Sequence, residues 1–184
     1  RGRPETPAKY AVVIHIYYHD LWEEFSQTLK AVDIDFDLFV TITYKDDDSD
    51  ALAEHIRQEW PDARVVFMPN HGRDIFPFIH LVNSGLLDSY AAVCKFHTKK
   101  SPHRQDGDQW RQHLIGGILP GAKTSALLER FVADPDAAVW VADGQHYEGT
   151  KWWGSNFERA AELLQRVEIK CDKDHLSFPA GSMY

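Results

Sequence analysis

Short apolar runs that alternate with helical patterns constrain the fold of this chain most strongly. Residues 11–17 read Ala-Val-Val-Ile-His-Ile-Tyr, a continuous β-branched run that predicts a strand buried on both faces. Apolar residues between Leu21 and Val32 then recur at helical spacing. Because this pair of patterns repeats along the chain, we predict an α/β fold with a mainly parallel, twisted sheet and helices on both faces.

The same patterns give the remaining elements. Strands are predicted over residues 37–43, 64–68, 90–96 and 137–142, and helices over residues 51–60, 75–86, 109–118, 125–133 and 156–167. The acidic residues 46–50 are interpreted as a loop, with Ser49 or Asp50 as the N-cap of the following helix. Ligands of such folds bind at the carboxyl ends of the strands, so the turns that follow the strands are the places to look for a site.

The length of 184 residues fits a single domain over residues 1–184, in which we expect residues 1–9 to be flexible. Because the sequence opens without Met, we expect it to be part of a longer protein. No window approaches the roughly 18 apolar residues that a transmembrane helix needs, so direct membrane insertion is not expected. Cys94 and Cys171 form no CxxC pair, which favours a reduced, cytoplasmic protein. Any contact with the inner face of the membrane would then come through partners or missing segments.

The charge of the chain is uneven. Its net charge of −8 argues against nucleic acid as a partner, because neutralising phosphates favours a basic surface. Between residues 95 and 111, however, five Lys or Arg residues stand against two Asp residues, an excess of three positive charges. The cations are Lys95, Lys99, Lys100, Arg104 and Arg111, and the acids are Asp106 and Asp108. This stretch is where we expect an anion to bind.

The turn after the third predicted strand offers groups that bind anions. Residues 69–74 read Pro-Asn-His-Gly-Arg-Asp, and free N–H groups at a helix start favour negative charge. Asn70 is one candidate to bind the donor. Gly72 allows the backbone to approach a ligand closely, and Arg73 offers a planar fork suited to phosphate or carboxylate. Asp74 has two interpretations: it caps the helix, or it binds a sugar or nucleotide hydroxyl or acts as a base.

A cationic stretch follows the fourth predicted strand, where residues 95–100 read Lys-Phe-His-Thr-Lys-Lys. Alternate side chains of an extended chain point to one side, so Lys95, His97 and Lys99 would line the same side and suit a diphosphate. A solvated lysine-rich loop is the common alternative. Lys95 directly follows the apolar Ala-Ala-Val-Cys, and a charge at the edge of a core needs a partner. The candidates of this stretch are Lys95, His97, Thr98, Lys99 and Lys100.

Other polar residues are weaker candidates. Arg111 would lie beside the same loop at the start of the next helix, where the neighbouring Trp110 is more often a core residue. His15 stands inside an apolar strand, where a histidine is more often a hydrogen-bonded core residue than a functional one. The sequence contains no HExxH and no GxGxxG, Walker or GxSxG motif, and these absences remove the common dinucleotide, NTPase and hydrolase explanations.

Together these motifs resemble the rhamnan synthesis protein F family. The matching stretches are His15–Tyr18, Asp37–Thr41, Asn70–Phe78, Lys95–Ser101, Trp110-Arg111 and Phe178–Tyr184, which span nearly the whole chain. The resemblance implies a GT-A-like fold and a glycosyltransferase role in rhamnose-containing polysaccharide or lipopolysaccharide assembly. It implies a nucleotide-diphosphate sugar as donor and a glycan as acceptor. Further candidates from the matching stretches are His15, Tyr17, Thr41 and Trp110.

One departure from GT-A enzymes concerns the metal. Those enzymes usually carry Asp-x-Asp at the end of the fourth strand, where this chain reads Lys95-Phe96-His97. Lysines would neutralise the departing diphosphate directly, so we expect transfer without a metal cofactor, although a divalent cation is not excluded. An acidic residue would then deprotonate the acceptor hydroxyl, and the candidates are Asp74, Asp106 and Asp143, or a base in a missing segment.

Two other functions fit the sequence. The first is a non-catalytic module that binds a sugar nucleotide or glycan within a larger polysaccharide-synthesis protein. The second is a phosphate-ester hydrolase, which would need an acid cluster that holds a metal or an activated nucleophile. Residues 46–48 are a poor version of such a cluster, since a local acidic run is usually solvated.

Overall fold

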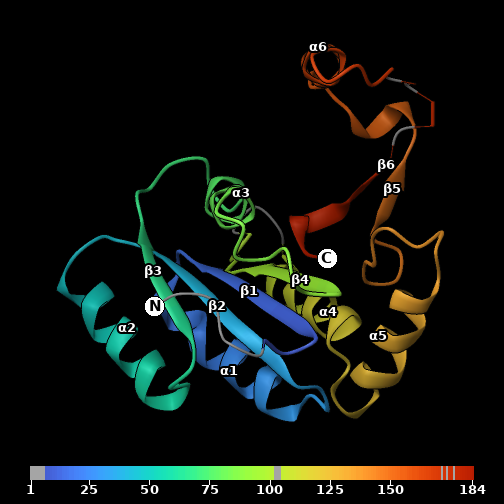
Figure 1. Cartoon of the computed structure of the whole chain (residues 1–184). Helices are drawn as coiled ribbons and strands as arrows, with labels where there is room; N and C mark the ends of the chain where they lie inside the picture. The colour runs from blue at the N-terminus through green and yellow to red at the C-terminus, as the bar shows by residue number, and fades with distance from the viewer. Residues whose placement is uncertain (1–6, 102–104, 171, 173, 176) are drawn as a thin grey trace.

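A four-stranded parallel sheet with the strand order β3-β2-β1-β4 forms the centre of the protein (Figure 1). The computed structural model describes residues 7–101, 105–170, 172, 174–175 and 177–184. The strands of the sheet are β1 (Tyr10–Ile16), β2 (Phe36–Thr43), β3 (Arg64–Met68) and β4 (Ala92–His97). β1 lies between β2 and β4, and all of its residues are buried, as its continuous apolar run predicts.

Six α-helices accompany these strands in the described part of the chain. They are α1 (Trp22–Ala31), α2 (Asp47–Glu59), α3 (Ile75–Asn83), α4 (Gly107–Ile118), α5 (Thr124–Ala133) and α6 (Phe157–Gln165). Short 3₁₀ turns are η1 (His19–Leu21), η2 (Gly121–Lys123), η3 (Thr150–Trp152) and η4 (Ala180–Ser182). Across the described ranges, none of the helices has both the length and the apolar character needed to span a membrane.

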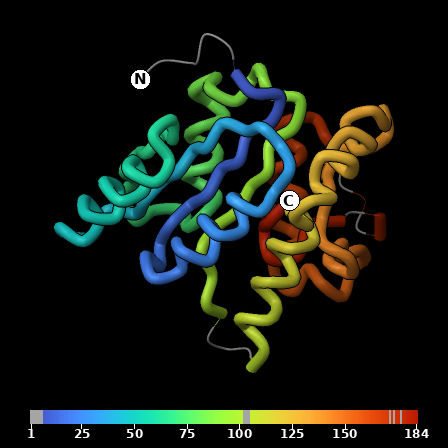
Figure 2. The backbone as a smooth tube through the Cα atoms, turned by 90° about the horizontal axis from the view of Figure 1, so that it is seen from below, coloured from blue at the N-terminus to red at the C-terminus, as the bar shows by residue number. Residues whose placement is uncertain are grey.

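Helices cover both faces of the sheet. Val12 and Ile14 of β1 belong to the larger apolar core, which the sheet forms with α1, α2 and α4. Seen from below, these helices lie in front of the sheet (Figure 2). Ala11 and Val13 point to the opposite face and cluster with Leu81 of α3. The predicted α/β fold with a parallel sheet and helices on both faces is therefore confirmed.

Residues 47–50 of the predicted acidic loop form the first turn of α2, so that interpretation is wrong. The helix begins at Asp47, after Asp46, because carboxylates near a helix start interact favourably with its dipole. Ser49 is not the N-cap either. It lies inside the first turn, and its hydroxyl accepts a hydrogen bond from the N–H of Lys45 at 3.0 Å.

The N-terminal end of the described chain is tied to the sheet. The N–H of Ala8 donates to the carboxylate of Asp37 at 3.2 Å. The carbonyl of Lys9 accepts a hydrogen bond from the N–H of Ala91 at 2.9 Å. Within the stretch that was expected to be flexible, Ala8 and Lys9 thus have defined partners, and residues 1–6 lie outside the described ranges.

After α5 the chain leaves the sheet. The predicted strand over residues 137–142 is wrong, because within the described part of the chain this segment pairs with no strand, and residues 137–141 instead line the cavities described below. The strands that follow, β5 (His146–Glu148) and β6 (Ser177–Pro179), pair antiparallel with each other. With α6 they form what we call the C-terminal arm, the described part of residues 145–179. The arm rises beside α5 and carries α6 at its tip (Figure 1).

Candidate functional site

Buried polar side chains gather at the carboxyl-terminal half of the sheet, on the face that α3 covers. Successive residues of a strand point to opposite faces, so alternate positions of β1, β2 and β4 share this face. Nearer the strand starts these positions are apolar, as at Ala11 and Phe39. Further along they are polar and still buried. With the residue before α3 they form what we call the polar cluster: His15, Thr41, Thr43, Asp74, Lys95 and His97.

Lys95 is the most deeply buried charge of this cluster, with 1% of the residue exposed. Its Nζ donates to Oδ2 of Asp74 at 2.8 Å and to the carbonyl oxygen of Ser182 at 2.7 Å. Burial lowers the pKa of Lys95 below its ordinary value, and Asp74 opposes that shift. Because an unpaired buried ammonium is strongly unfavourable, the carboxylate of Asp74 is what allows Lys95 to occupy this position.

Asp74 therefore pairs with Lys95 and does not cap α3, since its side chain forms no capping hydrogen bond. About 15% of the side chain is exposed. Burial alone would raise the pKa of Asp74, but His97 and Lys95 hold it below its usual value. At neutral pH the structure thus presents an ionised carboxylate at the edge of the cluster, partly open to solvent.

Two neutral histidines complete the cluster. Nδ1 and Nε2 of His15 lie 3.0 Å and 3.3 Å from the hydroxyls of Thr41 and Thr43. Burial lowers the pKa of His15 to about 4, so it has the hydrogen-bonded environment of a core histidine. Burial also lowers the pKa of His97 to about 4. Its Nδ1 lies 3.6 Å from Oδ2 of Asp74 and has no hydrogen-bond partner in the described structure.

The C-terminal segment, residues 180–184, covers Lys95 from the edge of the sheet. Lys95 and Tyr184 exchange backbone hydrogen bonds of 2.6 Å and 3.2 Å, so the segment lies along the outer edge of β4. Gly181 has a φ of 80°, and a Cβ there would lie 2.7 Å from a methyl of Leu114. Residues 178–184 stand among the stretches that match the family motifs, but no local pattern pairs them with Lys95. This contact therefore could not be predicted from the sequence.

The turn before α3 has a strained backbone, which lets residue 72 lie close to the side chain of Phe76. Gly72 and Arg73 have φ values of 64° and 54°, and a Cβ on Gly72 would lie 2.4 Å from that of Phe76. The turn thus needs a glycine at position 72. Asn70 and Arg73 are exposed, and Arg73 has no ion pair among the groups that the structure describes. Its guanidinium is available to an anion.

Thr98 and Tyr17 join the ends of β4 and β1. The Thr98 hydroxyl accepts hydrogen bonds from the N–H groups of Tyr17 and Tyr18 at 2.8 Å and 2.9 Å. The N–H of Thr98 donates to the carbonyl of His15 at 2.9 Å. Lys45 donates to the Tyr17 carbonyl at 2.6 Å, and its ammonium lies 4.0 Å from the centre of the Tyr17 ring. Thr98, predicted to bind diphosphate, thus holds the strand ends together.

The cations predicted to bind the diphosphate after β4 differ in the contacts that they make. Lys99 places its ammonium 4.3 Å from the centre of the Trp110 ring, and the Trp110 indole donates to Gln145 at 2.9 Å. Lys100 pairs with Asp20 at 2.6 Å, with 41% and 63% of the two side chains exposed. Arg104 lies outside the described residues.

Arg111 is buried and fully engaged, so it supports the loop instead of presenting a free cation. It donates to the carboxylates of Glu24 and Asp108 at 2.8–2.9 Å. It also donates to the carbonyl of Lys99 at 2.8 Å. The predicted place of Arg111 beside this loop does not indicate what its guanidinium binds.

The three predicted acids do not play equivalent parts in the structure. Asp74 is the one whose carboxylate binds Lys95. Asp106 is exposed at the residue before α4, where its carbonyl accepts from Trp110. Asp143 is exposed beside α4, where its carbonyl lies 2.8 Å from Nε2 of His113. The position of Asp74 therefore sets it apart from the other two.

Two cavities lie beside the sheet, away from the polar cluster. The larger has a volume of about 820 Å³ and lies between α5, residues 134–141 and the C-terminal arm. The smaller, of about 270 Å³, borders β4 and includes Tyr184. Neither is lined by Asp74, Lys95 or His97. Over the described ranges, no three His, Cys, Asp or Glu side chains group in a way that could hold a metal ion.

Comparison with known proteins places the chain in a family. The rhamnan synthesis protein F family matches residues 3–183. Two proteins named uncharacterized protein WxcX, from two strains of Xanthomonas campestris pv. campestris, are 30% and 29% identical over 173 residues, or 94% of this chain. The chain spans about 25% of the length of these relatives. No solved structure matches it. The chain therefore belongs to the rhamnan synthesis protein F family, whose name indicates a role in polysaccharide synthesis.

Proposed function

We propose that this chain binds a nucleotide-diphosphate sugar at the carboxyl edge of its parallel sheet and transfers the sugar to a growing cell-surface polysaccharide. The observation that carries the proposal is the polar cluster, in which Asp74, Lys95 and His97 meet next to the start of α3. Open α/β sheets bind ligands outside the carboxyl ends of their strands. A role in polysaccharide synthesis makes a sugar the expected substrate.

The donor diphosphate would bind to three cations around this edge, of which Arg73 and Lys100 are exposed and Lys99 is half-buried. Arg73 occupies the strained turn before α3, where the helix dipole favours an anion, although the N–H groups of Ile75 and Phe76 already donate to the carbonyl of Gly72. Lys100 is held by an ion pair between largely exposed groups, and such pairs are weak enough to exchange partners. Lys99 follows on the same loop. These three cations would neutralise the departing diphosphate without requiring a metal ion.

The sequence predicts that Lys95 binds the diphosphate, but in this proposal it has a different role. Both of its acceptors, Asp74 and Ser182, are protein groups, and the ammonium is 1% exposed. Contact with a diphosphate would require the C-terminal segment to move away. We therefore treat Lys95 as a positioning residue that fixes and ionises Asp74, and assign the diphosphate to Arg73, Lys99 and Lys100.

Asp74 is the general base of the proposal. Its lowered pKa keeps it ionised at neutral pH, so it is able to accept a proton from the acceptor hydroxyl. The two contacts given above for its carboxylate both involve Oδ2, and the side chain is partly exposed. The unpaired Nδ1 of His97 lies beside it and would bind the same hydroxyl group.

A non-catalytic module that binds sugar nucleotide or glycan is the second candidate. The observation that favours it is the Asp74–Lys95 ion pair, because a carboxylate neutralised by a buried ammonium is a weak base. Asp106 and Asp143 are exposed and lie outside the polar cluster. This candidate predicts donor binding without turnover.

The test begins with donor binding. Thermal unfolding is measured with a panel of nucleotide-diphosphate sugars, in the presence of Mg²⁺, Mn²⁺ or EDTA, because a ligand of the folded state raises the melting temperature. We expect a shift that survives EDTA and that Arg73→Ala abolishes. The matched control Arg159→Ala, on the exposed surface of α6, should keep it. No shift with any donor, or equal shifts in both variants, would refute the donor site.

Sugar transfer then separates the two candidates. Asp74→Asn should bind the donor and lose transfer by about 10²–10⁴-fold, whereas Asp143→Asn should transfer as the wild type does. Asp74→Glu retains a carboxylate and should recover part of the activity. Donor binding without transfer in the wild type would instead support the binding module.

A further inference from the structure

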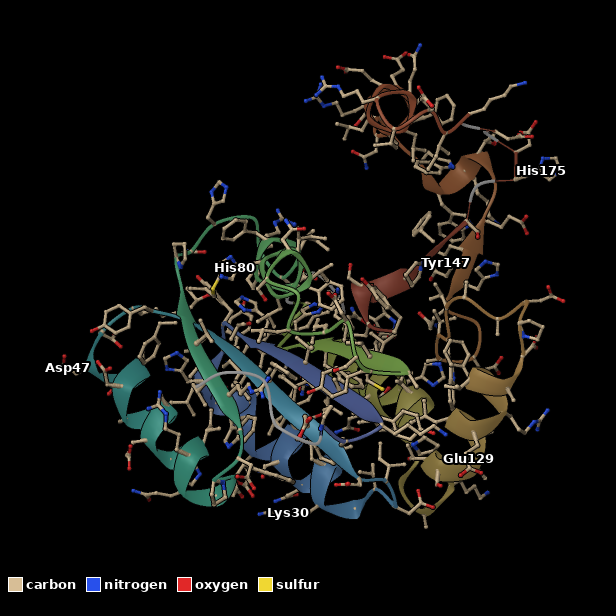
Figure 3. All side chains as sticks on the ribbon, in the orientation of Figure 1. Lys30, Asp47, His80, Glu129, Tyr147 and His175 are labelled. Carbon is tan, nitrogen blue, oxygen red and sulfur yellow. The ribbon has the colours of Figure 1, made fainter. Side chains whose placement is uncertain are left out.

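The larger cavity has the size and the lining of a ligand site. Its volume of about 820 Å³ falls within the range of roughly 300–1,000 Å³ that is usual for such sites. Three parts of the chain border it: α5, residues 134–141 and the paired strands of the C-terminal arm. In Figure 3, Glu129 marks α5 and Tyr147 marks the arm, the two elements on either side of the cavity. Nothing in the proposed donor site uses this cavity.

Aromatic rings form part of its wall. Phe131 and Trp140 line it with ring centres 6.1 Å apart. Phe178 lines it from the arm, and its ring contacts Tyr147 at 6.0 Å and Trp153 at 5.8 Å. Ring faces of this kind pack well against the C–H groups on one side of a sugar ring. The aromatic contacts thus hold together a wall that suits a pyranose.

The polar groups of the lining suit a neutral ligand. Arg130 and Asp134 are its charged residues, one of each sign, and His146 and Ser177 add hydrogen-bonding groups. All four are exposed. A diphosphate would need an excess of positive charge, which this lining lacks. Hydroxyl groups, by contrast, both donate and accept, so they can pair with a guanidinium, a carboxylate, an imidazole and a hydroxyl.

The smaller cavity connects this pocket with the edge of the sheet. The two cavities share four lining residues, among them Phe131 and Trp140. The smaller one continues along β4 to Tyr184, whose backbone is bonded to Lys95. An extended ligand in the larger pocket would therefore point towards the segment that covers the polar cluster.

From these observations we infer that the pocket between α5 and the C-terminal arm binds a stretch of neutral glycan, the acceptor chain of the proposed transfer. Its aromatic wall packs on sugar rings, Arg130 and Asp134 bind hydroxyl groups, and the shared cavity leads along β4 to Tyr184 of the C-terminal segment. The identification of this glycan as the acceptor rests on the proposed function. The pocket's preference for a neutral glycan follows from its own residues.

The test measures glycan binding by titration calorimetry, with a short rhamnose oligosaccharide as probe and a maltose oligosaccharide of equal length for comparison. Arg130→Ala and Trp140→Leu should each weaken binding of the rhamnose probe about tenfold, the size expected for a lost charged hydrogen bond or ring contact. Arg159→Ala on α6 and Phe67→Ala on β3, at the opposite edge of the sheet, are the matched controls and should bind as the wild type does. Urea unfolding of each variant shows whether it is folded at the assay temperature.

The outcomes separate this inference from the proposed function. If the wild type binds nucleotide sugar but neither oligosaccharide, or if folded pocket variants bind the oligosaccharide unchanged, the pocket assignment is wrong and the donor site stands. If the oligosaccharide binds in the pocket and no nucleotide sugar binds, the pocket assignment stands and the transferase proposal fails. Loss in the pocket variants with unchanged donor shifts supports both.

Discussion

The sheet and the C-terminal arm are stabilised in different ways. Helix α1 packs on the sheet through Trp22, Phe25 and Leu29, which are at most 3% exposed, whereas α6 has no buried residue. In the arm, aromatic rings contact each other: Tyr147 and Trp152 stack with ring centres 4.2 Å apart. Figure 1 shows the sheet enclosed by helices and the arm standing beside it. We therefore expect substitutions in the sheet to affect global stability, and those in the arm to act locally.

The largest effect should come from the ion pair inside the sheet. Asp74→Asn leaves the Lys95 ammonium buried without its counter-charge, and breaking a buried pair in this way costs about 3–5 kcal/mol. The double variant Asp74→Asn, Lys95→Met should recover most of the loss, because an apolar replacement of both partners is often nearly neutral. Urea unfolding monitored by circular dichroism measures both.

Lys100→Ala is the control for this comparison. It removes an ion pair whose partners are 41% and 63% exposed, and solvent screens such pairs. Its free energy of unfolding should stay close to that of the wild type. Equal losses in Asp74→Asn and Lys100→Ala would show that burial of Lys95 does not set the stability of the sheet.

The next effect is a pH dependence that originates in the sheet. Between the ordinary histidine pKa of 6.5 and the folded value of about 4 for His15, the unfolded chain binds a proton that the folded chain does not. Stability should therefore fall as the pH is lowered through this interval, by up to about 3 kcal/mol for one histidine. His97 acts in the same direction, and the lowered pKa of Asp74 adds a further loss below about pH 4.

Unfolding free energies at pH 7, 6, 5 and 4 measure this slope. His15→Gln should be less stable than the wild type at pH 7 and show a shallower slope, since one of the two buried histidines is gone. His175→Gln, in the exposed arm, should leave the slope of the global transition in place. A wild-type stability that does not change over this interval would contradict the assignment of neutral buried histidines.

The sheet and the segment that leads to the C-terminal arm also differ in how well the sequence predicts them. The run over residues 11–17 predicts β1 because both of its faces are buried. Residues 137–142 look equally strand-like, but a strand needs a partner with free backbone groups, and no local pattern supplies one. The sequence predicts a loop over residues 46–50 because acidic residues suit a solvated loop as well as the first turn of a helix.

For the site, the sequence predicts which residues lie at the strand ends but not which of them contact each other. The place of Lys95 at the end of an apolar run indicates a buried charge that needs a partner, and Asp74 follows another strand. Their contact depends on how α3 lies on the sheet, which packing decides. The hydrogen bond from Lys95 to Ser182 joins residues 87 positions apart, and the arm between them gives no sequence signal for it.

A smaller effect is expected where α4, which packs on the sheet, contacts residue 142 of the segment that leads to the arm. A Cβ on Gly117 of α4 would lie 2.5 Å from the Cβ of Ala142, so Gly117→Ala should cost about 1–3 kcal/mol through overpacking. At the adjacent Gly116, such a Cβ would meet no atom within 4 Å apart from the neighbouring residues and backbone of α4 itself. Gly116→Ala should stabilise the helix by about 0.5–1 kcal/mol. Thermal unfolding of the two variants compares them, and a stabilising shift in Gly117→Ala as in Gly116→Ala would mean that α4 and residue 142 are not in contact.

The smallest effect should come from the arm itself, and one substitution made in two helices tests it. Leu29→Ala in α1 removes a side chain of a residue that is 3% exposed and should cost about 2–5 kcal/mol. Leu163→Ala in α6 acts on a residue that is 47% exposed and should change the free energy of unfolding by less than about 0.5 kcal/mol. Measuring both at two protein concentrations shows whether α6 is buried by self-association. A loss of 2 kcal/mol or more in Leu163→Ala, present only at the higher concentration, would mean that the apolar side of α6 packs against a second copy of the chain, and that the arm is stabilised by burial as the sheet is.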